Sequence, residues 1–292
     1  MVGLRPSPGR VPTWPALNAW DGLGVEGPMA RSAADCALLL SVMAGPDARA
    51  PLSIDEPGAR FRGPLAHDWA GTRVAWTPDL GGLPVERRVR RVCESALPTL
   101  TALGCEVEAA CPDFRGAMET FQVLRAHAFA LALGPFFPQI APLVKDTVRW
   151  NVEQGLALSG TDVARATRER TELYHRVRAF LEGYAFLVLP VSQVAPFDLS
   201  LDWVHEIEGV PMPTYVDWMA SCCVVTLTGL PAISVPAGFC EEGMPVGLQI
   251  VGRHHADFEV LALAHAFEAA TGFGARLPPL ASGTGPLPAG PP

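Results

Sequence analysis

Two apolar segments joined by a tight turn constrain the fold of this chain more than any other feature. Residues 232–236 and 247–252 are strand-like, and Glu241-Glu242-Gly243 between them is a turn sequence. A helix is predicted over 215–228, ended by Gly229-Leu230-Pro231. Because both faces of such apolar strands need cover, this pattern predicts a sheet packed on both sides by helices.

Strands and helices are interspersed along the rest of the chain, without an internal repeat, which favours one α/β domain with a mixed β-sheet covered by helices. Further strands are predicted at 72–76, 105–108 and 186–189. The last of these is a continuous apolar run, as expected of a strand buried on both faces. Two long helices are predicted at 116–133 and 162–182.

Local signals predict where other elements begin and end. Ser32 is a good N-cap for a helix that Gly45-Pro46 terminates. The buried face of that helix is expected to carry Cys36, Leu39, Leu40 and Met43. Pro98 should kink or divide the helix whose apolar face is Val85, Val89, Val92 and Ala96. Asp257 is expected to cap the last helix, and the proline-rich residues 1–28 to form an ordered loop rather than a helix or strand.

Composition excludes several classes of protein. Of 292 residues, 49% are hydrophobic and 18% charged, which is enough apolar material for a sizeable core in residues 1–276. The Pro/Gly-rich residues 277–292 cannot add to it and are expected to form a flexible tail. A net charge of −8 without a basic cluster argues against nucleic-acid binding.

Apolar run lengths and cysteine usage bear on membrane association and compartment. The longest apolar stretches fall short of the roughly 18 residues that a spanning helix needs, so no membrane association is expected. Seven cysteines occur without a Cys-x-x-Cys pair, and no secretory segment follows Met1. These features predict a cytoplasmic protein with reduced thiols.

Three short motifs bear on metal or cofactor chemistry. Gly22-x-Gly24-x-x-Gly27 matches a dinucleotide fingerprint, but a proline-rich loop precedes it and Pro28 follows it, so we interpret its glycines as turn residues. His254-His255 has no third ligand at helical spacing, and adjacent side chains should point apart, which indicates a polar loop. His205-Glu206 lacks the second histidine of a zinc-protease motif. No metal and no cofactor are therefore expected.

The sequence gives as little support for a catalytic nucleophile as for a metal or cofactor site. Cys222 and Cys223 lie on an apolar helical segment, where burial keeps a thiol protonated. Lys145, the only lysine, has a helix-like context, and His265 is more typical of a core histidine than of a base. No Gly-x-Ser-x-Gly elbow is present. The residues alone thus indicate an α/β domain without a self-sufficient active site.

Four segments, taken together, resemble the amidase-signature family. They are Val-Gly-Leu-Arg-Pro-Ser-Pro-Gly-Arg-Val-Pro at 2–12, Gly-Pro-Met-Ala-Arg-Ser-Ala-Ala-Asp at 27–35, Thr-Gly-Leu-Pro-Ala-Ile-Ser-Val-Pro-Ala-Gly at 228–238 and Pro-Val-Gly-Leu-Gln-Ile-Val-Gly at 245–252. The resemblance covers about residues 2–275. It implies a mixed sheet wrapped in helices and hydrolysis of a carboxamide, a small-molecule substrate, to acid and amine.

The catalytic residues of that family cannot be placed on this sequence. The family uses a lysine, a serine in a cis peptide and a nucleophilic serine, which lie before the Val-Gly-Leu-Arg-Pro motif. Here that motif starts at residue 2, and no Gly-Gly-Ser-Ser-Gly-Gly segment occurs in the 292 residues. The resemblance therefore implies a C-terminal portion of an amidase-signature domain, with a sheet incomplete at its N-terminal side and no catalytic residue.

Substrate-binding residues can be carried over only as candidates. In the family, the segment before Gly-Leu-Pro helps to line the acyl pocket, which makes Asp217, Trp218 and Thr226 pocket candidates. Helix surface and core packing are equally good interpretations of all three.

Three hypotheses remain open from the sequence. The chain is a piece of an amidase, from a truncated or split gene or a start codon placed too late. Alternatively, it is a non-catalytic module that pairs with a separate N-terminal half, with another amidase or with its own copies. Finally, it is an independent hydrolase that uses Cys222, Cys223 or His265.

Overall fold

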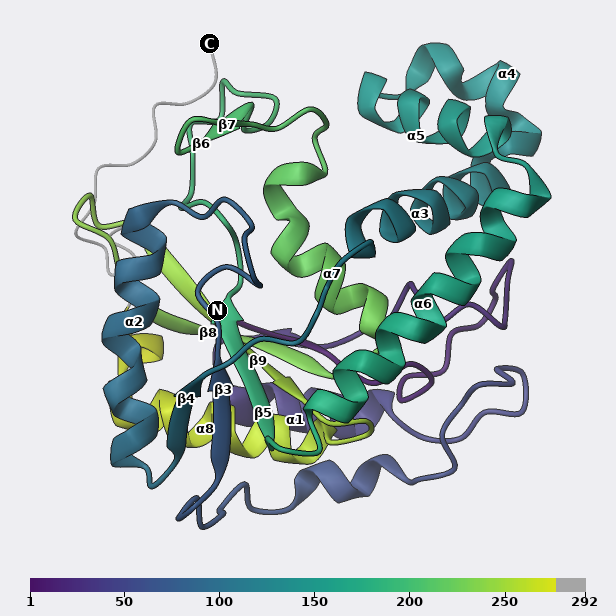
Figure 1. Ribbon diagram of the computed structural model, residues 1–292. Coiled ribbons are helices and arrows are strands. Elements are labelled where there is room, and N and C mark those ends of the chain that lie inside the picture. Colours follow the sequence, from purple (N-terminus) through teal and green to yellow (C-terminus); the bar gives the residue numbers. More distant parts are fainter. Residues whose placement is uncertain (277–292) are drawn as a thin grey trace, which may run out of the picture.

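A seven-stranded mixed sheet lies at the centre of the computed structural model, which describes residues 1–276 (Figure 1). The predicted tail, 277–292, lies outside the described residues. Across the sheet the strands are β2 (Met29–Ala30), β1 (Val2–Arg5), β8 (Ala232–Phe239), β9 (Pro245–Gly252), β5 (Phe186–Pro190), β3 (Arg73–Trp76) and β4 (Glu106–Ala109). Strand β3 runs parallel to β4 and β5, and the other neighbours are antiparallel.

The predicted hairpin forms the middle of this sheet. Strands β8 and β9 pair along their length, with Ser234 opposite Gln249, and the turn closes where the Cys240 amide donates to the Met244 carbonyl. Ile233 and Val235 point into one apolar cluster, while Ala232 belongs to the other. Side chains of successive residues thus feed two separate cores, as a strand with two covered faces requires.

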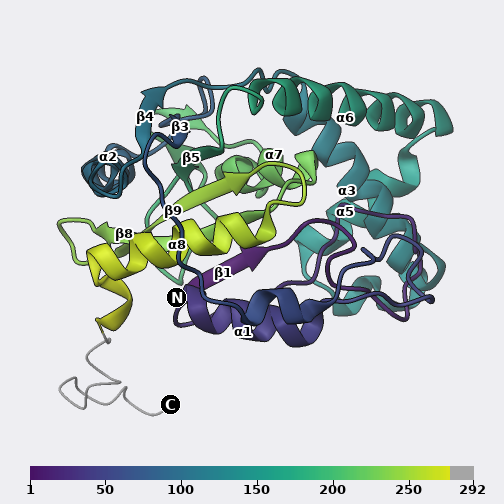
Figure 2. The same ribbon diagram turned by 90° about the horizontal axis from the view of Figure 1, so that it is seen from below.

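Helices cover each face of the sheet (Figure 2). One layer consists of α1 (Ala33–Met43), α2 (Arg87–Ala102) and α8 (Asp257–Thr271). The other contains α3 (Ala117–Leu133), α6 (Gly160–Phe180) and α7 (Ala220–Thr228). Strands and helices lie where the sequence predicts them, within one to three residues at most ends. No helix among residues 1–276 is long and apolar enough to cross a bilayer.

A helical extension and a small ribbon complete the described part. The extension follows α3 and contains η2 (Gly134–Phe136), α4 (Phe137–Ile140), η3 (Ala141–Leu143) and α5 (Asp146–Ala157), with α5 packed on α3. The ribbon is β6 (Glu206–Ile207) with β7 (Val210–Pro211). Single-turn helices are η1 (Gly58–Arg62), η4 (Asp217–Met219) and η5 (Phe273–Ala275). No element is predicted from the sequence for 134–157, where no long apolar period marks these short helices.

Three local predictions are wrong, for identifiable reasons. Residues 2–5, expected in a loop, form β1, because Val2 and Leu4 reach the core and the backbone pairs with β8. Pro98 does not divide α2, which continues through it to Ala102 with Pro98 on its exposed side, while the predicted kink stays a prediction. Leu39 is 43% exposed rather than buried, because α1 buries Ala33, Cys36, Ala37, Leu40 and Ser41 instead.

A fourth prediction, that Asp257 caps the last helix, is also wrong. The same residue joins the N-terminal segment around Ser7 and Arg10 to the start of α8. It is the first residue of α8 rather than its cap, which is Ala256. Its carboxylate, fully buried, accepts hydrogen bonds from the Ser7 amide at 2.7 Å and from the Ser7 hydroxyl at 2.9 Å. Arg10 pairs with the same carboxylate at 3.0 Å and also bonds Glu56.

We predict that Asp257→Ala lowers the free energy of unfolding by about 3–5 kcal/mol, because it leaves the buried Arg10 guanidinium without its buried partner. Urea unfolding followed by circular dichroism measures this. Glu241→Ala, which breaks the exposed pair with Arg91, is the matched control and should change little. Equal effects of the two substitutions would contradict a structural role for the buried pair.

Candidate functional site

The three predicted pocket residues lie on one segment, η4 and the α7 that follows it. Asp217 and Trp218 belong to η4, and Thr226 lies in the last half of α7. All three side chains are half-buried. Thr226 shares its side of α7 with Cys222, four residues earlier, while Cys223, Val224 and Leu227 face the core.

The position of α7 is fixed at both ends. At its start, the fully buried Gln193 accepts from the Ser221 amide and donates to the Pro84 carbonyl at 3.0 Å. At its end, Gly229 adopts a left-handed φ of 69°. Arg170 binds the Leu227 carbonyl there at 3.0 Å. Cations at a helix C-terminus offset the partial negative charge of its free carbonyls, so α7 forms a rigid wall.

Arg5 reinforces the same corner. Its guanidinium donates to the carbonyls of Leu23 and Leu230, and the nearby Arg170 repeats this arrangement. Burial, followed by the charge of Arg170, lowers the pKa of Arg5 to about 10. The arginine of the Val-Gly-Leu-Arg-Pro motif is thus a structural tie between β1 and the end of α7.

Polar side chains from three elements meet beside η4, and we refer to them as the polar wall. Its members are Gln122, Arg125, Asn151, Thr214, Tyr215 and Asp217. Asp217 accepts from the amide and hydroxyl of Thr214, at 2.6 and 2.7 Å. Tyr215 takes hydrogen bonds from Arg125, at 2.8 Å, and from Asn151. Among residues 1–276, Arg125 forms no salt bridge, which is unusual for a partly buried cation.

Three buried polar atoms on α3, η4 and β9 have no hydrogen-bond partner among the described residues. Arg125 Nε and Trp218 Nε1 are buried without a hydrogen-bond partner, and so is Gln249 Nε2. The alternation of β9 places Gln249 on the face of Val251, which is the face that α7 covers. Buried donors without acceptors are rare in proteins, so each of these atoms is a candidate to bind a polar ligand.

The candidate nucleophiles are not assembled into a catalytic pair. Burial raises the pKa of Cys222, and it raises that of Cys223 to about 12. The Cys222 thiol lies 2.9 Å from the Val191 carbonyl, which cannot act as a base. His265 lies on α8, in the layer opposite α7, and Lys145 is exposed at the start of α5.

The remaining motifs have structural explanations. A Cβ at Gly27 would meet the Leu4 carbonyl oxygen at 2.1 Å, so this glycine permits close chain approach. His205 pairs with Asp202 on the surface at 2.9 Å. The rings of His254 and His255 do not point apart as predicted, but stack at 3.7 Å, because His255 has a left-handed φ of 61°. No cluster of three His, Cys, Asp or Glu in the described chain is placed to hold a metal ion.

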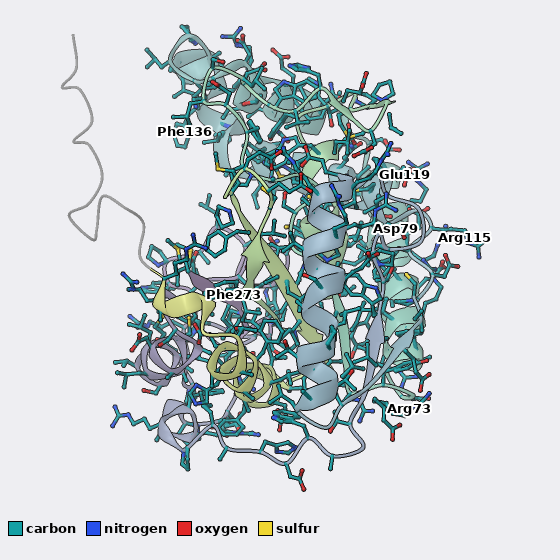
Figure 3. All side chains as sticks on the ribbon, turned by 90° about the vertical axis from the view of Figure 1, so that its left-hand side faces the viewer. Arg73, Asp79, Arg115, Glu119, Phe136 and Phe273 are labelled. Atoms are coloured by element: carbon teal, nitrogen blue, oxygen red, sulfur yellow. The ribbon has the colours of Figure 1, made fainter. Side chains whose placement is uncertain are left out.

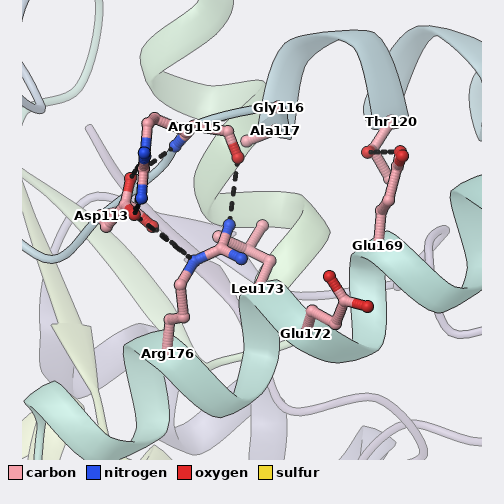
Figure 4. A pocket seen from close by; sticks show the side chains of 9 residues that line it. All are labelled: Asp113, Arg115, Gly116, Ala117, Thr120, Glu169, Glu172, Leu173 and Arg176. Atoms are coloured by element: carbon pink, nitrogen blue, oxygen red, sulfur yellow. Dashed lines mark hydrogen bonds and ion pairs between the residues drawn. The ribbon is translucent and has the colours of Figure 1, made fainter.

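Two cavities near the start of α3 hold no reactive group. The first, about 310 Å³, lies between α3 and α6 (Figure 4). In it, Thr120 donates to Glu169, and Arg176 binds the main-chain carbonyls of Asp113 and Arg115. The second, about 420 Å³, adjoins the carboxyl ends of β3 and β4, near Arg115 and Glu119 (Figure 3). Its one thiol, Cys111, has a pKa raised by burial.

Comparison with known proteins places this geometry in a family. Residues 1–261 match the family model described as Amidase. This chain belongs to the amidase family. It is 33% identical over 283 residues to an acylamidase of Rhodococcus erythropolis, covering 92% of this chain and 57% of that protein. It is also 28% identical over 305 residues to a glutamyl-tRNA(Gln) amidotransferase subunit from Chromobacterium violaceum, covering 96% and 62%.

Solved structures show the same fold. A bacterial aryl acylamidase of the amidase-signature enzymes superposes with a TM-score of 0.83 at 23% identity, over 94% of this chain and 59% of that one. A 6-aminohexanoate cyclic dimer hydrolase, complexed with substrate, gives 0.81 at 25% identity, over 96% and 62%. The described amidase chain therefore has the mixed, helix-covered sheet predicted for it, and it spans about three fifths of the length of these relatives.

Of the residues in the polar wall, only Asp217 was predicted from the sequence. Gln122, Arg125 and Asn151 come from α3 and α5, which α6 and β5 separate from α7 along the chain. One available signal was Arg125 itself, a charged residue within an otherwise apolar helical run. No spacing rule links that helix to α7, because their contact is set by the tertiary fold.

We predict that Cys223 reacts with iodoacetamide at pH 8 roughly a thousand-fold more slowly than a free thiol, because a pKa of about 12 leaves little thiolate. Mass spectrometry of peptides from a timed reaction measures each cysteine. Labelling in denaturant is the control and should modify all seven. Rapid labelling of Cys222 or Cys223 in the folded chain would support the independent hydrolase.

Proposed function

We propose that this amidase chain supplies the acyl-binding wall and the sheet scaffold for hydrolysis of a carboxamide C–N bond. Amide and water would give an acid and an amine or ammonia. The lysine, cis-serine and nucleophilic serine of the amidase signature would come from residues outside these 292. The substrate is a small-molecule amide, and Asp217, Trp218 and Thr226 are the proposed substrate-binding residues.

One observation carries this proposal. The described residues leave buried donors of Arg125 on α3 and Trp218 on η4 without partners, yet they supply no nucleophile with a base in reach. Arg125 and the indole N–H of Trp218 can bind the oxygens of a polar acyl group, and the half-buried Thr226 extends the same side of α7. Binding groups without attacking groups fit one side of a divided active site.

A second candidate function is a non-catalytic module that pairs with a separate catalytic half or with another amidase. An exposed apolar surface on α1 and β2 favours it. Met29, Leu38 and Val42 are each more than half exposed, and Leu39 lies with them. We refer to these four residues as the α1 surface. It borders β2, a two-residue edge strand, so both apolar area and free backbone groups are available for a partner.

We also propose that the protein is located in the cytoplasm, as its sequence predicts. All seven cysteines are free, and five of them are buried, where they act as small apolar residues. A reducing compartment suits such a set.

We predict that the 292-residue chain alone releases no ammonia from acetamide or benzamide above the buffer rate. Co-expression with a segment that carries the family's lysine and Gly/Ser-rich serine loop should restore hydrolysis. The same segment with its nucleophilic serine changed to alanine is the control. Turnover by the chain alone at enzyme-like rates would overturn the proposal, and Cys222→Ala, Cys223→Ala and His265→Ala would then identify the group responsible.

The complemented enzyme also tests the substrate-binding assignment. Asp217→Asn weakens the hydrogen bonds that fix Thr214, so we expect kcat/KM to fall about ten-fold, or about 1.4 kcal/mol of transition-state stabilisation. Asp198→Asn, on an exposed turn, is the matched control. If both variants behave alike, Asp217 is a packing residue.

A further prediction concerns the α1 surface. Leu38→Glu combined with Val42→Glu should reduce self-association of the isolated chain and weaken its complementation, because the two charges oppose burial of the apolar contact. Sedimentation velocity measures the first effect and recovered amidase activity the second. Leu199→Glu, at a fully exposed leucine elsewhere, controls for added charge. An unchanged sedimentation profile and unchanged complementation would argue against a partner at this surface.

A further inference from the structure

A cavity of about 380 Å³ lies beside the start of β5, lined mainly by aromatic and imidazole rings. These are His67, Trp69, Phe186, His254 and His255. Phe186 is the first residue of β5, and the polar wall lies beyond the last residue of that strand. Five residues of strand span roughly 16 Å, which separates the cavity from the polar wall. We propose that this cavity binds a small aromatic carboxylate, at a site separate from the one assigned to amide hydrolysis.

The indole of Trp69 is the clearest indication of a ligand. Trp69 is only 4% exposed, and its N–H has no hydrogen-bond partner. Its ring contacts His67, at 4.3 Å between centroids, and Phe186, at 5.8 Å. A buried donor without an acceptor is costly, and Trp69 lines the cavity, so a bound molecule whose oxygen displaces the neighbouring ring far enough to reach this N–H would satisfy it. The neighbouring rings would hold an aromatic group by stacking.

The two adjacent histidines are held in an unfavourable arrangement. His255 has a φ of 61°, a conformation that residues other than glycine rarely adopt. This brings its ring onto that of His254 at 3.7 Å, and His254 in turn contacts Tyr174. Such local strain is concentrated at functional sites, and here both stacked rings line the cavity.

The charges around the cavity favour an anion. Arg253 is fixed by the carbonyls of Leu181 and Tyr184, at 2.8 and 2.9 Å, and forms no salt bridge among the described residues. The start of α8 also faces the cavity through Ala256. This helix end has no side-chain cap, because Asp257 is directed to Ser7 and Arg10.

One acidic group, Glu259, lies at the edge of the cavity, and it pairs with Arg60 at 3.7 Å. The guanidinium of Arg253 and the free amides of α8 therefore outweigh it, whereas burial and then the neighbouring His254 lower the pKa of His255 and favour its neutral ring. A ring with a carboxylate matches both the aromatic walls and this excess of donors.

Benzoate is the probe. We expect benzoate added to the 292-residue chain to shift the imidazole C–H resonances of His67, His254 and His255 and to give saturation-transfer signals from its ring. Benzyl alcohol, which has the ring without the charge, and acetate, which has the charge without the ring, should bind more weakly. Equal binding of benzoate and benzyl alcohol would overturn the assignment of an anion site.

Substitutions separate this cavity from the proposed acyl-binding wall. Trp69→Phe removes the N–H and keeps an aromatic ring, so benzoate affinity should fall about five-fold. Trp218→Phe, which removes the other unpartnered indole N–H, is the matched control and should leave it unchanged. Glu259→Gln, which removes the one acidic group, should tighten binding. Sensitivity to Trp218→Phe instead of Trp69→Phe would place benzoate at the polar wall and refute the separate site.

Discussion

The buried contact of Asp257 with Ser7 and Arg10 joins the first ten residues of the chain to the last third, and the rest of the fold depends on it. Strand β1 pairs with β8 directly above this contact, so one end of the sheet is built from segments more than 200 residues apart. The network also places α8, because the carboxylate belongs to its first residue. A buried ion pair adds little stability compared with apolar packing, but it fixes geometry, since either partner alone would be an unsatisfied charge.

Apolar periodicity accounts for what the sequence could predict. The hairpin of β8 and β9, the buried strand β5 and the long helices α3 and α6 all follow from local patterns, because each buries a face whose period is visible in the residues. Two of the incorrect predictions share one cause. Residues 2–5 become a strand only because β8 is there to pair with them, and Leu39 is exposed only because α1 packs through its smaller residues. Neither fact is encoded locally.

The residues of the candidate site are even harder to predict from local sequence patterns. Asp217, Trp218 and Thr226 could be named as candidates from family resemblance, since they lie in the segment before the Gly-Leu-Pro motif. Arg125, Asn151 and Tyr215 could not, because three separate elements must fold before their side chains meet. Cys222 and Cys223 lie on a helix that is packed against the sheet, and burial raises the pKa of both thiols, which agrees with the prediction that they are poor nucleophiles. Fold-level packing, rather than residue type, determines which groups can react.

Unpartnered buried donors distinguish the two regions proposed to bind ligands from the rest of the described chain. Five such atoms occur among residues 1–276, in Trp69, Arg90, Arg125, Trp218 and Gln249. Arg90 and Arg125 each bind a partner through another nitrogen, Arg90 the Val85 carbonyl and Arg125 the Tyr215 hydroxyl. Arg125 belongs to α3 and Trp218 to η4, Gln249 lies on the face of β9 that α7 covers, and Trp69 lines the aromatic cavity beside the start of β5. A fold that satisfies nearly all of its buried polar groups leaves donors open where an acceptor from outside can complete them.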